Sequence, residues 1–513
     1  MQTLNTLNPE QLIYTDEDLT IEILGGIRLD RLDGLRVTLK MEYENTTHRH
    51  TLDLYNDIQV TKLIRRSAGK LQLGMGSLSD SIESLTQELE QYRLEQREEQ
   101  NGNKPKTVEL SKTEIKQATE LLKTEDLLKK TNELVGKSGV IGEENNRLLM
   151  YIIFTSRKMS NPLHIISMGA SGTGKSHLQE TVAELIPEEE TLSVTDLSES
   201  SFYYFDTNEL SHKLMLIEDL DGASDALYPL RELQSKKSIS KQYVDKTGSK
   251  PKTVHRTVYG PVCLSGCTTK EQIYEDNANR SFLIYIDSSQ EQDKRIMNFQ
   301  RALSAGKINQ AEQEQIRNLL KNSQRILKPL KVINPFAEQL ELPNSVFKPR
   351  RTNAHYLHFI EAVTFYNQYQ REVKVNKETG EEFIETTIED IENANQLLKD
   401  ILIKKSDKLS PACRDYFERL KMKLIGEKIK TFTNRETSIR LDKSIASVKR
   451  YHSELYDKHF LKIKKKNKQG GFEYEIVSYE EYRQLEENIA TILDETLRKI
   501  KTDKGSKNTN KDK

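Results

Sequence analysis

The alternation of hydrophobic and polar positions divides the chain into segments of different period. Residues 12–55 alternate between the two kinds of residue, which is typical of strands with one buried face. The clearest runs are Leu19–Leu24, Leu35–Tyr43 and Thr51–Tyr55, with Gly25 and Gly26 as a turn. From Asp57 the spacing becomes helical, and a second helix is predicted to run to about Gln100. The breaker sequence Asn101–Pro105 then predicts the end of an N-terminal α+β domain of residues 1–105.

Residues 106–290 contain short, wholly apolar runs that alternate with helical spacing. Such runs are typical of parallel strands that are buried on both faces of a sheet. They occur at Leu163–Met168, Leu214–Ile217, Val262–Leu264 and Phe282–Ile286. Residues 291–405 are predicted to be mostly helical, with one hairpin formed by Glu372–Val375 and Phe383–Thr387. The predicted fold class is therefore multidomain α/β, with a parallel-sheet core followed by a helical region.

The segment 406–482 is predicted to be a small separate domain with the layout of a winged helix. Its predicted elements are the helices Asn434–Leu441 and Ser444–His459 and the strands Leu461–Lys466 and Phe472–Val477. In the second helix, the residues expected to face the core are Ile445, Val448, Leu455 and Phe460, and those expected to face outward are Lys443, Ser447, Lys449, Arg450 and His452. Residues 483–513 are predicted to be a helix followed by a disordered basic tail.

The predicted wing is locally basic although the chain as a whole is neutral. The chain carries 78 Lys and Arg residues against 79 Asp and Glu residues, so only a local excess of charge can indicate a nucleic-acid partner. The basic residues of the wing are Lys462, Lys464, Lys465, Lys466 and, at its turn, Lys468. We expect the wing, together with Lys449 and Arg450, to contact the backbone of duplex DNA. A domain that makes protein contacts, or a solvated strand, is the alternative.

The composition excludes several classes of protein. No apolar run approaches the roughly 18 residues that a membrane span needs, and the first residues lack the basic and apolar regions of a secretion signal. Three cysteines are too few for a disulfide scaffold or a four-thiolate zinc site. Cys263 and Cys267 are expected to be small residues on or near a buried strand. We therefore expect a cytoplasmic protein with no membrane partner.

A phosphate-binding motif follows the first apolar run. Gly169–Ser176 fits G-x-x-x-x-G-K-S, with an apolar strand before it and a helix, Lys175–Ile186, after it. Gly169, Gly172 and Gly174 let the loop turn its N–H groups toward phosphate. The residues expected to bind nucleotide here are therefore Gly169, Gly172, Thr173, Gly174, Lys175 and Ser176. Lys175 would reach the terminal phosphates and the Ser176 hydroxyl would bind Mg²⁺, so ATP and Mg²⁺ are the expected cofactors.

A second candidate element is the apolar strand Leu214–Ile217, which ends in carboxylates. Glu218 is expected to hold Mg²⁺, and Asp219 is expected to orient or deprotonate the attacking water. The usual order in this fold is Asp followed by Glu, so the pair is predicted, but the assignment of the two roles stays open. Asp221 is expected to cap a helix or to support the other two acids.

The order of these parts resembles that of the AAA+ ATPases. The resemblance is to the branch that contains the minichromosome maintenance helicases and the primase-helicases of plasmids, phages and integrative elements. It covers about residues 135–405 and implies a P-loop sheet core with a helical lid. A hairpin, Ser238–Tyr243 and Thr253–Tyr259, precedes the third core strand. In this branch such a hairpin grips DNA in a central channel, which implies DNA contacts for the tip lysines Lys246, Lys250 and Lys252. Plain solvation of the tip is the alternative.

The same resemblance implies three further roles at the nucleotide. Thr268, or its neighbour Thr269, stands where the family usually has an Asn that senses the γ-phosphate. Arg280, followed by Ser281-Phe282 and a strand, is similar to an arginine finger that acts on a neighbouring subunit. Arg351, in preference to Arg350, is similar to the second sensor of the lid. For Arg280, an ordinary surface ion pair is the alternative.

These features together predict an ATP-dependent DNA helicase or translocase that acts in replication of a bacterial mobile element. Residues 12–100 also resemble the segment between the primase and ATPase modules in primase-like proteins of such elements. The expected partners are DNA, further copies of the chain in a ring, and a separate primase or replication protein. One alternative is an AAA+ initiator or regulator that binds duplex DNA without unwinding it. Another is a nucleotide-binding protein that has lost hydrolysis, because the order of Glu218 and Asp219 is inverted.

Overall fold

The computed structural model describes most of the chain. The described residues are 3–6, 8–16, 18–29, 32–44, 46–101, 108–195, 198, 200–223, 226–245, 252–270, 279–343, 346, 348–466 and 471–509. They form two compact units, Met1–Glu109 and Leu110–Lys513. The expected domain end at residue 105 lies outside the described residues, and the expected boundaries after residues 290, 405 and 482 stay predictions.

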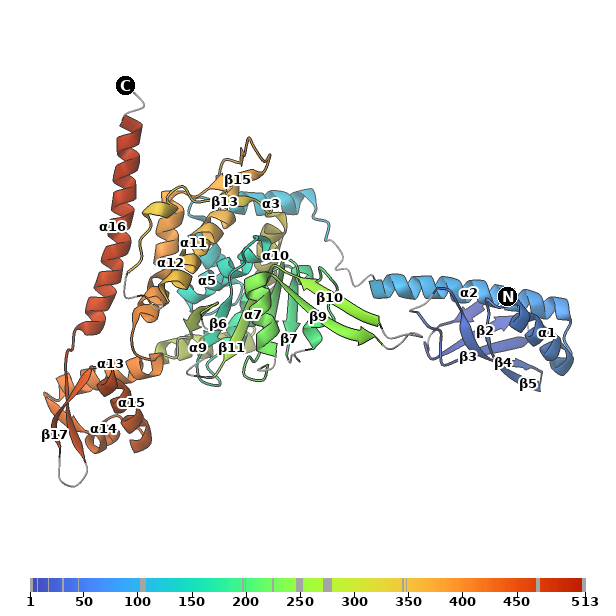
Figure 1. Cartoon of the computed structure of the whole chain (residues 1–513), viewed down its shortest axis with the longest axis horizontal. Coiled ribbons are helices and arrows are strands. Elements are labelled where there is room, and N and C mark those ends of the chain that lie inside the picture. Colours follow the sequence, from blue (N-terminus) through green and yellow to red (C-terminus); the bar gives the residue numbers. More distant parts are fainter. Residues whose placement is uncertain are drawn as a thin grey trace. The chain divides into compact units, whose positions relative to one another are not determined.

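The N-terminal unit is an antiparallel meander covered by two helices (Figure 1). Its elements are β1 (Thr3–Asn5), β2 (Gln11–Asp16), β3 (Leu19–Leu24), β4 (Arg36–Tyr43), β5 (Thr46–Asp53), α1 (Asp57–Leu71) and α2 (Met75–Asn101). The alternation in β3 and β4 buries every second side chain, and these pack with leucines of both helices in one core. Gly26 has a φ of +64°, and a Cβ there would lie 2.3 Å from the Pro9 carbonyl oxygen, so this turn requires glycine.

A five-stranded parallel sheet forms the centre of the second unit, which confirms the predicted α/β fold. Its strands are β6 (Ile165–Met168), β7 (Thr191–Val194), β8 (Lys213–Ile217), β11 (Val262–Thr268) and β12 (Phe282–Tyr285). They lie in the order β12-β6-β11-β8-β7, and all the pairings are parallel. Met168 pairs with Thr268, so the carboxyl ends of β6 and β11 meet at one edge. The edge strand β7 was not predicted, because its side chains are only partly buried.

Helices lie around this sheet (Figure 1), and all of them except α7 and α9 contribute buried residues to one core with it. Their bounds are α3 (Lys112–Leu122), α4 (Leu127–Lys137), α5 (Glu144–Thr155), α6 (Lys175–Ala183), α7 (Leu227–Lys236), α9 (Gln290–Ser304), α10 (Gln310–Ile326), α11 (Pro349–Tyr366) and α12 (Ile388–Ser406). Helices α6 and α7 both contact β11. Cys263 and Cys267 are buried on β11, as expected, and burial raises the pKa of their thiols to about 12 and about 11.

Two smaller sheets accompany the core. The predicted hairpin is confirmed as β9 (Ser238–Asp245) paired with β10 (Lys252–Tyr259), in a sheet of its own. In the helical region, β14 (Lys374–Val375) and β15 (Glu382–Glu385) form the second predicted hairpin. A third strand, β13 (Lys331–Ile333), pairs with β15 in parallel and was not predicted.

The C-terminal part contains the predicted helices and hairpin, with additions. Its elements are α13 (Pro411–Gly426), β16 (Thr431–Thr433), α14 (Asn434–Arg440), α15 (Ile445–Asp457), β17 (Leu461–Lys466) and β18 (Phe472–Ile476). They enclose a core of their own, and β16 extends the hairpin to three strands in the order β16-β18-β17.

Two expected side-chain orientations in α15 are wrong. His452 was expected to face outward, but its side chain is 0% exposed, because the Tyr416 hydroxyl lies 2.7 Å from Nε2 and Asn434 Oδ1 lies 2.6 Å from Nδ1. Both ring nitrogens are therefore paired inside the core, and burial lowers the pKa of His452 to about 4. Ile445 was expected to face the core and is exposed instead, since it begins the helix.

The last helix, α16 (Glu481–Thr509), packs on α12. Ile489, Leu493 and Ile500 bury their side chains in the main core, and Lys501 forms an ion pair with Glu392 of α12. The basic tail that the composition predicted to be disordered is therefore helical as far as Thr509, because apolar residues at helical spacing anchor the segment before it.

Candidate nucleotide site

The predicted phosphate loop connects β6 to α6 at the carboxyl edge of the sheet. Gly172 and Gly174 have φ values of +80° and +88°, which residues with a Cβ rarely adopt, so the glycine spacing is needed for this turn. The Lys175 ammonium donates hydrogen bonds to the carbonyl oxygens of Gly169 at 2.8 Å and Ala170 at 2.6 Å. The lysine thus folds back over its own loop, and only 7% of it is exposed.

The acidic strand end faces this loop across a cleft of about 590 Å³. Residues from three segments line it: Gly172, Lys175 and Ser176 of the loop, Glu218 and Asp219 after β8, and Thr268 at the end of β11. Glu218 and Asp219 are both exposed. The structure therefore brings together the predicted loop residues, both predicted acids and the predicted sensor threonine.

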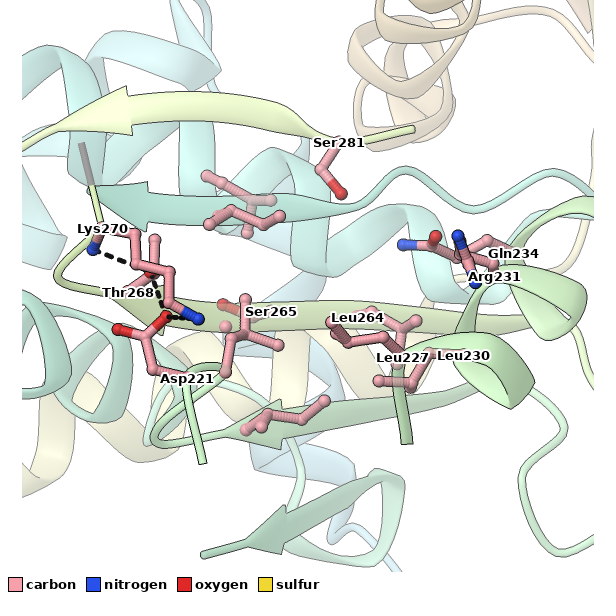
Figure 2. Close-up of a pocket in the computed structure, with 15 residues that line it drawn as sticks. Asp221, Leu227, Leu230, Arg231, Gln234, Leu264, Ser265, Thr268, Lys270 and Ser281 are labelled. Atoms are coloured by element: carbon pink, nitrogen blue, oxygen red, sulfur yellow. Dashed lines mark hydrogen bonds and ion pairs between the residues drawn. The ribbon is translucent and has the colours of Figure 1, made fainter. Parts of the chain in front are cut away.

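Asp221, which the sequence predicted either to cap a helix or to support the other two acids, contacts the sensor threonine of this site. Its carboxylate accepts a hydrogen bond from the Thr268 hydroxyl at 2.6 Å (Figure 2). It also accepts hydrogen bonds from the Thr269 N–H at 3.0 Å and the Thr269 hydroxyl at 2.9 Å. Lys270 Nζ lies 3.6 Å from it. Burial alone would raise the pKa of Asp221, but these donors and the lysine charge lower it. Asp221 therefore stays ionised and fixes the orientation of both threonines.

A mostly apolar cavity of about 110 Å³ lies beside this carboxylate, between α7 and the sheet. Figure 2 shows Asp221, Thr268 and Lys270 at one end of it, and Arg231 and Gln234 near the other. The cavity runs from the nucleotide edge toward the opposite edge of the sheet. No sequence pattern indicates it, because its lining comes from distant segments.

The two predicted arginines do not lie at the phosphate loop of their own chain. Arg280 and Arg351 line one pocket of about 280 Å³, together with residues that precede β6 and residues that begin β11. The pocket is therefore at the amino edge of the sheet, and the four residues of β6, about 13 Å at 3.3 Å per residue, separate it from the loop.

This amino-edge pocket is strongly basic. Lys237 joins the two arginines as a third cation in its lining, beside the imidazoles of His355 and His358, and none of the described lining residues is acidic. The pKa of His355 lies well below its usual value. Burial is the largest cause, and the smaller causes are the charges of Lys405, His164, His358 and Arg351. The pocket therefore favours an anionic occupant.

The side chains of the predicted DNA-contacting lysines of the hairpin lie outside the described part of the chain. Lys246 and Lys250 lie outside the described residues, and of Lys252 only the backbone is described. The body of the hairpin carries further cations on one face. Lys241 Nζ lies 5.0 Å from the centre of the Tyr203 ring.

The lysines of the predicted wing are partly neutralised. Lys462 and Lys464 of β17 both form ion pairs with Glu475 of β18, at 3.3 and 3.2 Å. Glu475 lies in the neighbouring strand, so the basic run Leu461–Lys466 overstates the local charge. Lys465, Lys466, Lys449 and Arg450 are exposed, with the Arg450 guanidinium 4.9 Å from the Tyr451 ring centre.

The residues at the phosphate loop fit Mg²⁺ only in combination with a nucleotide. Ser176, Glu218 and Asp219 supply oxygen atoms, which are the ligands that Mg²⁺ prefers. Among the described residues there is no cluster of three or more His, Cys, Asp or Glu side chains that could hold a metal ion by itself. Within the same part of the chain, no helix is both long and apolar enough to cross a membrane.

Comparison with known proteins identifies the central domain. Residues 110–329 match the family described as the MTBMA_p00010 P-loop domain. No curated protein matches the chain.

Among solved structures, a full-length MCM homolog from Methanopyrus kandleri is 11% identical, with a TM-score of 0.36, and the match covers 79% of this chain and 76% of that one. A SCCmec type IV Cch active helicase is 10% identical, with a TM-score of 0.26 and coverages of 94% and 99%. Drosophila ORC bound to DNA is 11% identical, with a TM-score of 0.22 and coverages of 74% and 93%. The family match, the strand order and the loop geometry together show that residues 110–329 hold a P-loop domain with an AAA+-like α/β fold.

Proposed function

We propose that this chain is an ATP-driven motor on DNA, a helicase or translocase that works as a ring in the replication of a bacterial mobile element, with a separate primase or replication protein as partner. The observation that carries the proposal is the division of the catalytic groups between two edges of one sheet. The loop, both acids and Thr268 line the cleft at the carboxyl edge, and Arg280 and Arg351 line the basic pocket at the amino edge.

At the carboxyl edge, the chain's own residues bind and orient the nucleotide. The loop N–H groups and the N-terminus of α6 would hold the phosphates, and Lys175, which now donates to two loop carbonyls, would contact them instead. A bound Mg²⁺ would neutralise the charge that develops on the phosphates. Ser176 and Glu218 would hold that ion. Asp219 would orient the attacking water and accept its proton.

The geometry of the two acids gives a testable division of labour. Asp219 Oδ1 accepts a hydrogen bond from the Asp221 N–H at 2.8 Å, so its carboxylate is held at the cleft. We expect Asp219→Asn to keep ATP binding and to lower hydrolysis about 100-fold or more, because the amide cannot accept the proton of water. Glu218→Gln is expected to weaken Mg²⁺-dependent ATP binding.

The measurement is a titration of ATP binding with and without Mg²⁺, beside phosphate release. Asp206→Asn is the matched control, since Asp206 lies on the same domain and outside the cleft. Reversed phenotypes would show that the inverted order has exchanged the two roles. Normal hydrolysis in both variants would contradict the assignment of the acids.

At the amino edge, Arg280 and Arg351 would act on the nucleotide of a neighbouring copy. An arginine side chain cannot bridge the length of a core strand to its own loop, but a second copy could dock its carboxyl edge against this pocket. The fixed positive charge of a guanidinium then stabilises the transferring phosphate. The pocket's excess of cations supports such an anionic occupant. Heterologous contacts of this kind give a ring where the rotation between copies closes, which is the assembly that we propose.

The body of the hairpin supports contact with a nucleic-acid strand. Arg256 Nη2 donates to the Tyr204 carbonyl oxygen at 3.2 Å, and its guanidinium lies 5.8 Å from the Tyr204 ring centre. Tyr204 is exposed and follows Tyr203, whose ring lies under the Lys241 ammonium. Tyr243, in strand β9, is exposed as well. Exposed aromatic rings beside cations are the combination that binds single strands, through base stacking and phosphate contacts.

We expect the double variant Lys241→Ala, Arg256→Ala to uncouple hydrolysis from movement. Neither residue lies in the nucleotide cleft, so ATP turnover should stay within about twofold, while unwinding of a forked duplex should fall at least about tenfold. The tip variant Lys246→Ala, Lys250→Ala, Lys252→Ala is expected to behave in the same way. The measurement is a strand-displacement assay beside phosphate release.

Tyr228→Ala is the matched control, because this exposed ring lies 5.8 Å from the Arg231 guanidinium in the same way but belongs to α7 and not to a hairpin strand. Normal unwinding by both hairpin variants would remove the mechanical part of the motor. In that case the second candidate function, an initiator that binds duplex DNA without unwinding it, would take its place. The exposed Lys465, Lys466, Lys449 and Arg450 of a winged helix favour duplex contact in either function.

A further inference from the structure

One helix of the N-terminal unit presents four cations on its solvent face, with a single carboxylate, Asp57, at its N-terminal end. Helix α1 buries Leu63, Ser67, Ala68 and Leu71 against the meander. At 100° per residue, its cations lie on the opposite side, within an arc of about 140°. They are Lys62, Arg65, Arg66 and Lys70, all exposed. We call these four residues the α1 basic stripe.

The stripe is unusual because its charges are uncompensated. None of its four side chains makes a hydrogen bond or an ion pair with any other residue that the structure describes. On the outer face of the neighbouring sheet, by contrast, Lys40 pairs with Glu22 at 2.8 Å. The unit as a whole carries more acidic than basic residues, so the stripe is a local concentration of positive charge. A charged surface left unpaired in this way is available to an anionic partner.

The charges of the stripe also act on a buried histidine of the sheet, His48. His48 of β5 lies against α1, with Nδ1 2.8 Å from the Ser67 hydroxyl. Burial is the largest cause of its lowered pKa, and the charges of Lys70, His50 and Arg66 lower it further. These charges therefore converge on one side of the unit.

The length and chemistry of the stripe favour duplex nucleic acid over other anions. From Lys62 to Lys70 the helix rises about 12 Å. A duplex carries roughly one negative charge per 1.7 Å of its axis, so a band of cations of this length can face several phosphates at once. Single strands are usually held by aromatic rings as well as cations, and the stripe contains no aromatic residue. An acidic protein would bury apolar side chains at the centre of the contact, whereas the only large apolar residue here is Ile58 at the N-terminal end.

We propose that the α1 basic stripe binds the phosphate backbone of duplex DNA without reading its sequence. This goes beyond the proposed motor, because it assigns a nucleic-acid surface to the unit of residues 1–109, which none of the catalytic or hairpin roles involves. Contacts of this kind position a protein on a duplex and carry no base information.

The first test places a fluorescent reporter within the stripe. The chain has no tryptophan, so Ile58→Trp in the full chain introduces a single indole. Ile58 is 81% exposed and shares a surface hollow with Lys62, Arg65 and Arg66, so the change leaves the core intact. We expect a mixed-sequence duplex of about two helical turns to quench this emission saturably. Val375→Trp, at another exposed site, is the control and should not respond.

The second test removes the charge. A fourfold variant changes every residue of the stripe to glutamine: Lys62→Gln, Arg65→Gln, Arg66→Gln and Lys70→Gln. We expect it to bind duplex DNA about tenfold more weakly, or worse, near physiological salt. The slope of log affinity against log salt should fall by up to about 3.6, at roughly 0.9 for each of four phosphate contacts. Glutamine has a helix propensity close to those of lysine and arginine, so α1 should stay folded. Basal ATP hydrolysis should not change.

The matched control removes four exposed lysines from α3 and α4, with Lys116, Lys129, Lys130 and Lys137 changed to Gln. An equal loss of affinity in the control would mean that only net charge matters, and would overturn the proposal. The proposal would also be overturned if the chain bound duplex DNA while the emission of the Ile58→Trp variant stayed unchanged. It would be overturned as well if the chain bound no duplex DNA at all. Equal quenching by poly-glutamate would assign the stripe to an acidic protein instead. None of these outcomes affects the motor proposal, which depends on hydrolysis and strand displacement.

Discussion

Lys175→Ala is expected to abolish ATP turnover while the chain stays folded. The lysine is almost fully buried at the base of the loop, and its ammonium is the group that can contact the terminal phosphates. Removal of a charge aimed at the reacting phosphate should lower hydrolysis by a factor of about 100 or more. Lys175 begins α6, and alanine favours a helix, so the loss should not unfold the domain.

The measurement is phosphate release together with the binding of a fluorescent ATP analogue, with circular dichroism and thermal unfolding to check the fold. Lys137→Ala is the matched control, because Lys137 is an exposed lysine at the end of α4, outside the cleft. Turnover close to that of the unchanged chain would contradict the assignment of the nucleotide site.

The second large effect is expected from mixing two inactive variants. Arg280→Ala should inactivate the chain, because the guanidinium at the amino edge would complete the site of a neighbouring copy. A mixture of Arg280→Ala chains with Lys175→Ala chains should regain activity. In a random, equal mixture, about a quarter of the interfaces would combine an intact loop with an intact arginine.

The same mixing experiment distinguishes a role in trans from other roles. Arg351→Ala is expected to complement Lys175→Ala in the same way, since Arg351 lines the same pocket as Arg280. Arg301→Ala, which changes an exposed arginine on α9, should stay active and serves as the control. Rings that contain both variants and show no recovery would mean that Arg280 has a structural role, such as its hydrogen bond to the Ser235 hydroxyl at 2.9 Å.

Where a feature depends on residues close together in the chain, the sequence was sufficient. The loop Gly169–Ser176, its flanking strand and helix, and the hairpin of β9 and β10 all follow from local spacing, and the structure contains them. The strands β3 and β4 are equally local, because alternation over six to eight residues sets which side chains face the core. Local patterns fail where burial is partial, as in the edge strand β7.

Contacts between distant residues were beyond the sequence. The Asp221 carboxylate orients Thr268 across 47 positions of the chain, and the wing lysines meet Glu475 only because β17 and β18 pair. His452 has the spacing of an outward-facing residue, yet two polar partners from other elements allow it to be buried neutral.

The sequence by itself determined that the chain has a phosphate loop on an α/β core, because backbone conformation and binding chemistry there reside in eight consecutive residues. Only the tertiary structure decided where the other groups lie relative to that loop. The parallel strand order places Glu218, Asp219 and Thr268 at the carboxyl edge and Arg280 with Arg351 at the amino edge. Residues that precede the core strands and residues that follow them lie at opposite edges of the sheet. The length of a strand therefore separates them in space, although only a few positions separate them in the sequence.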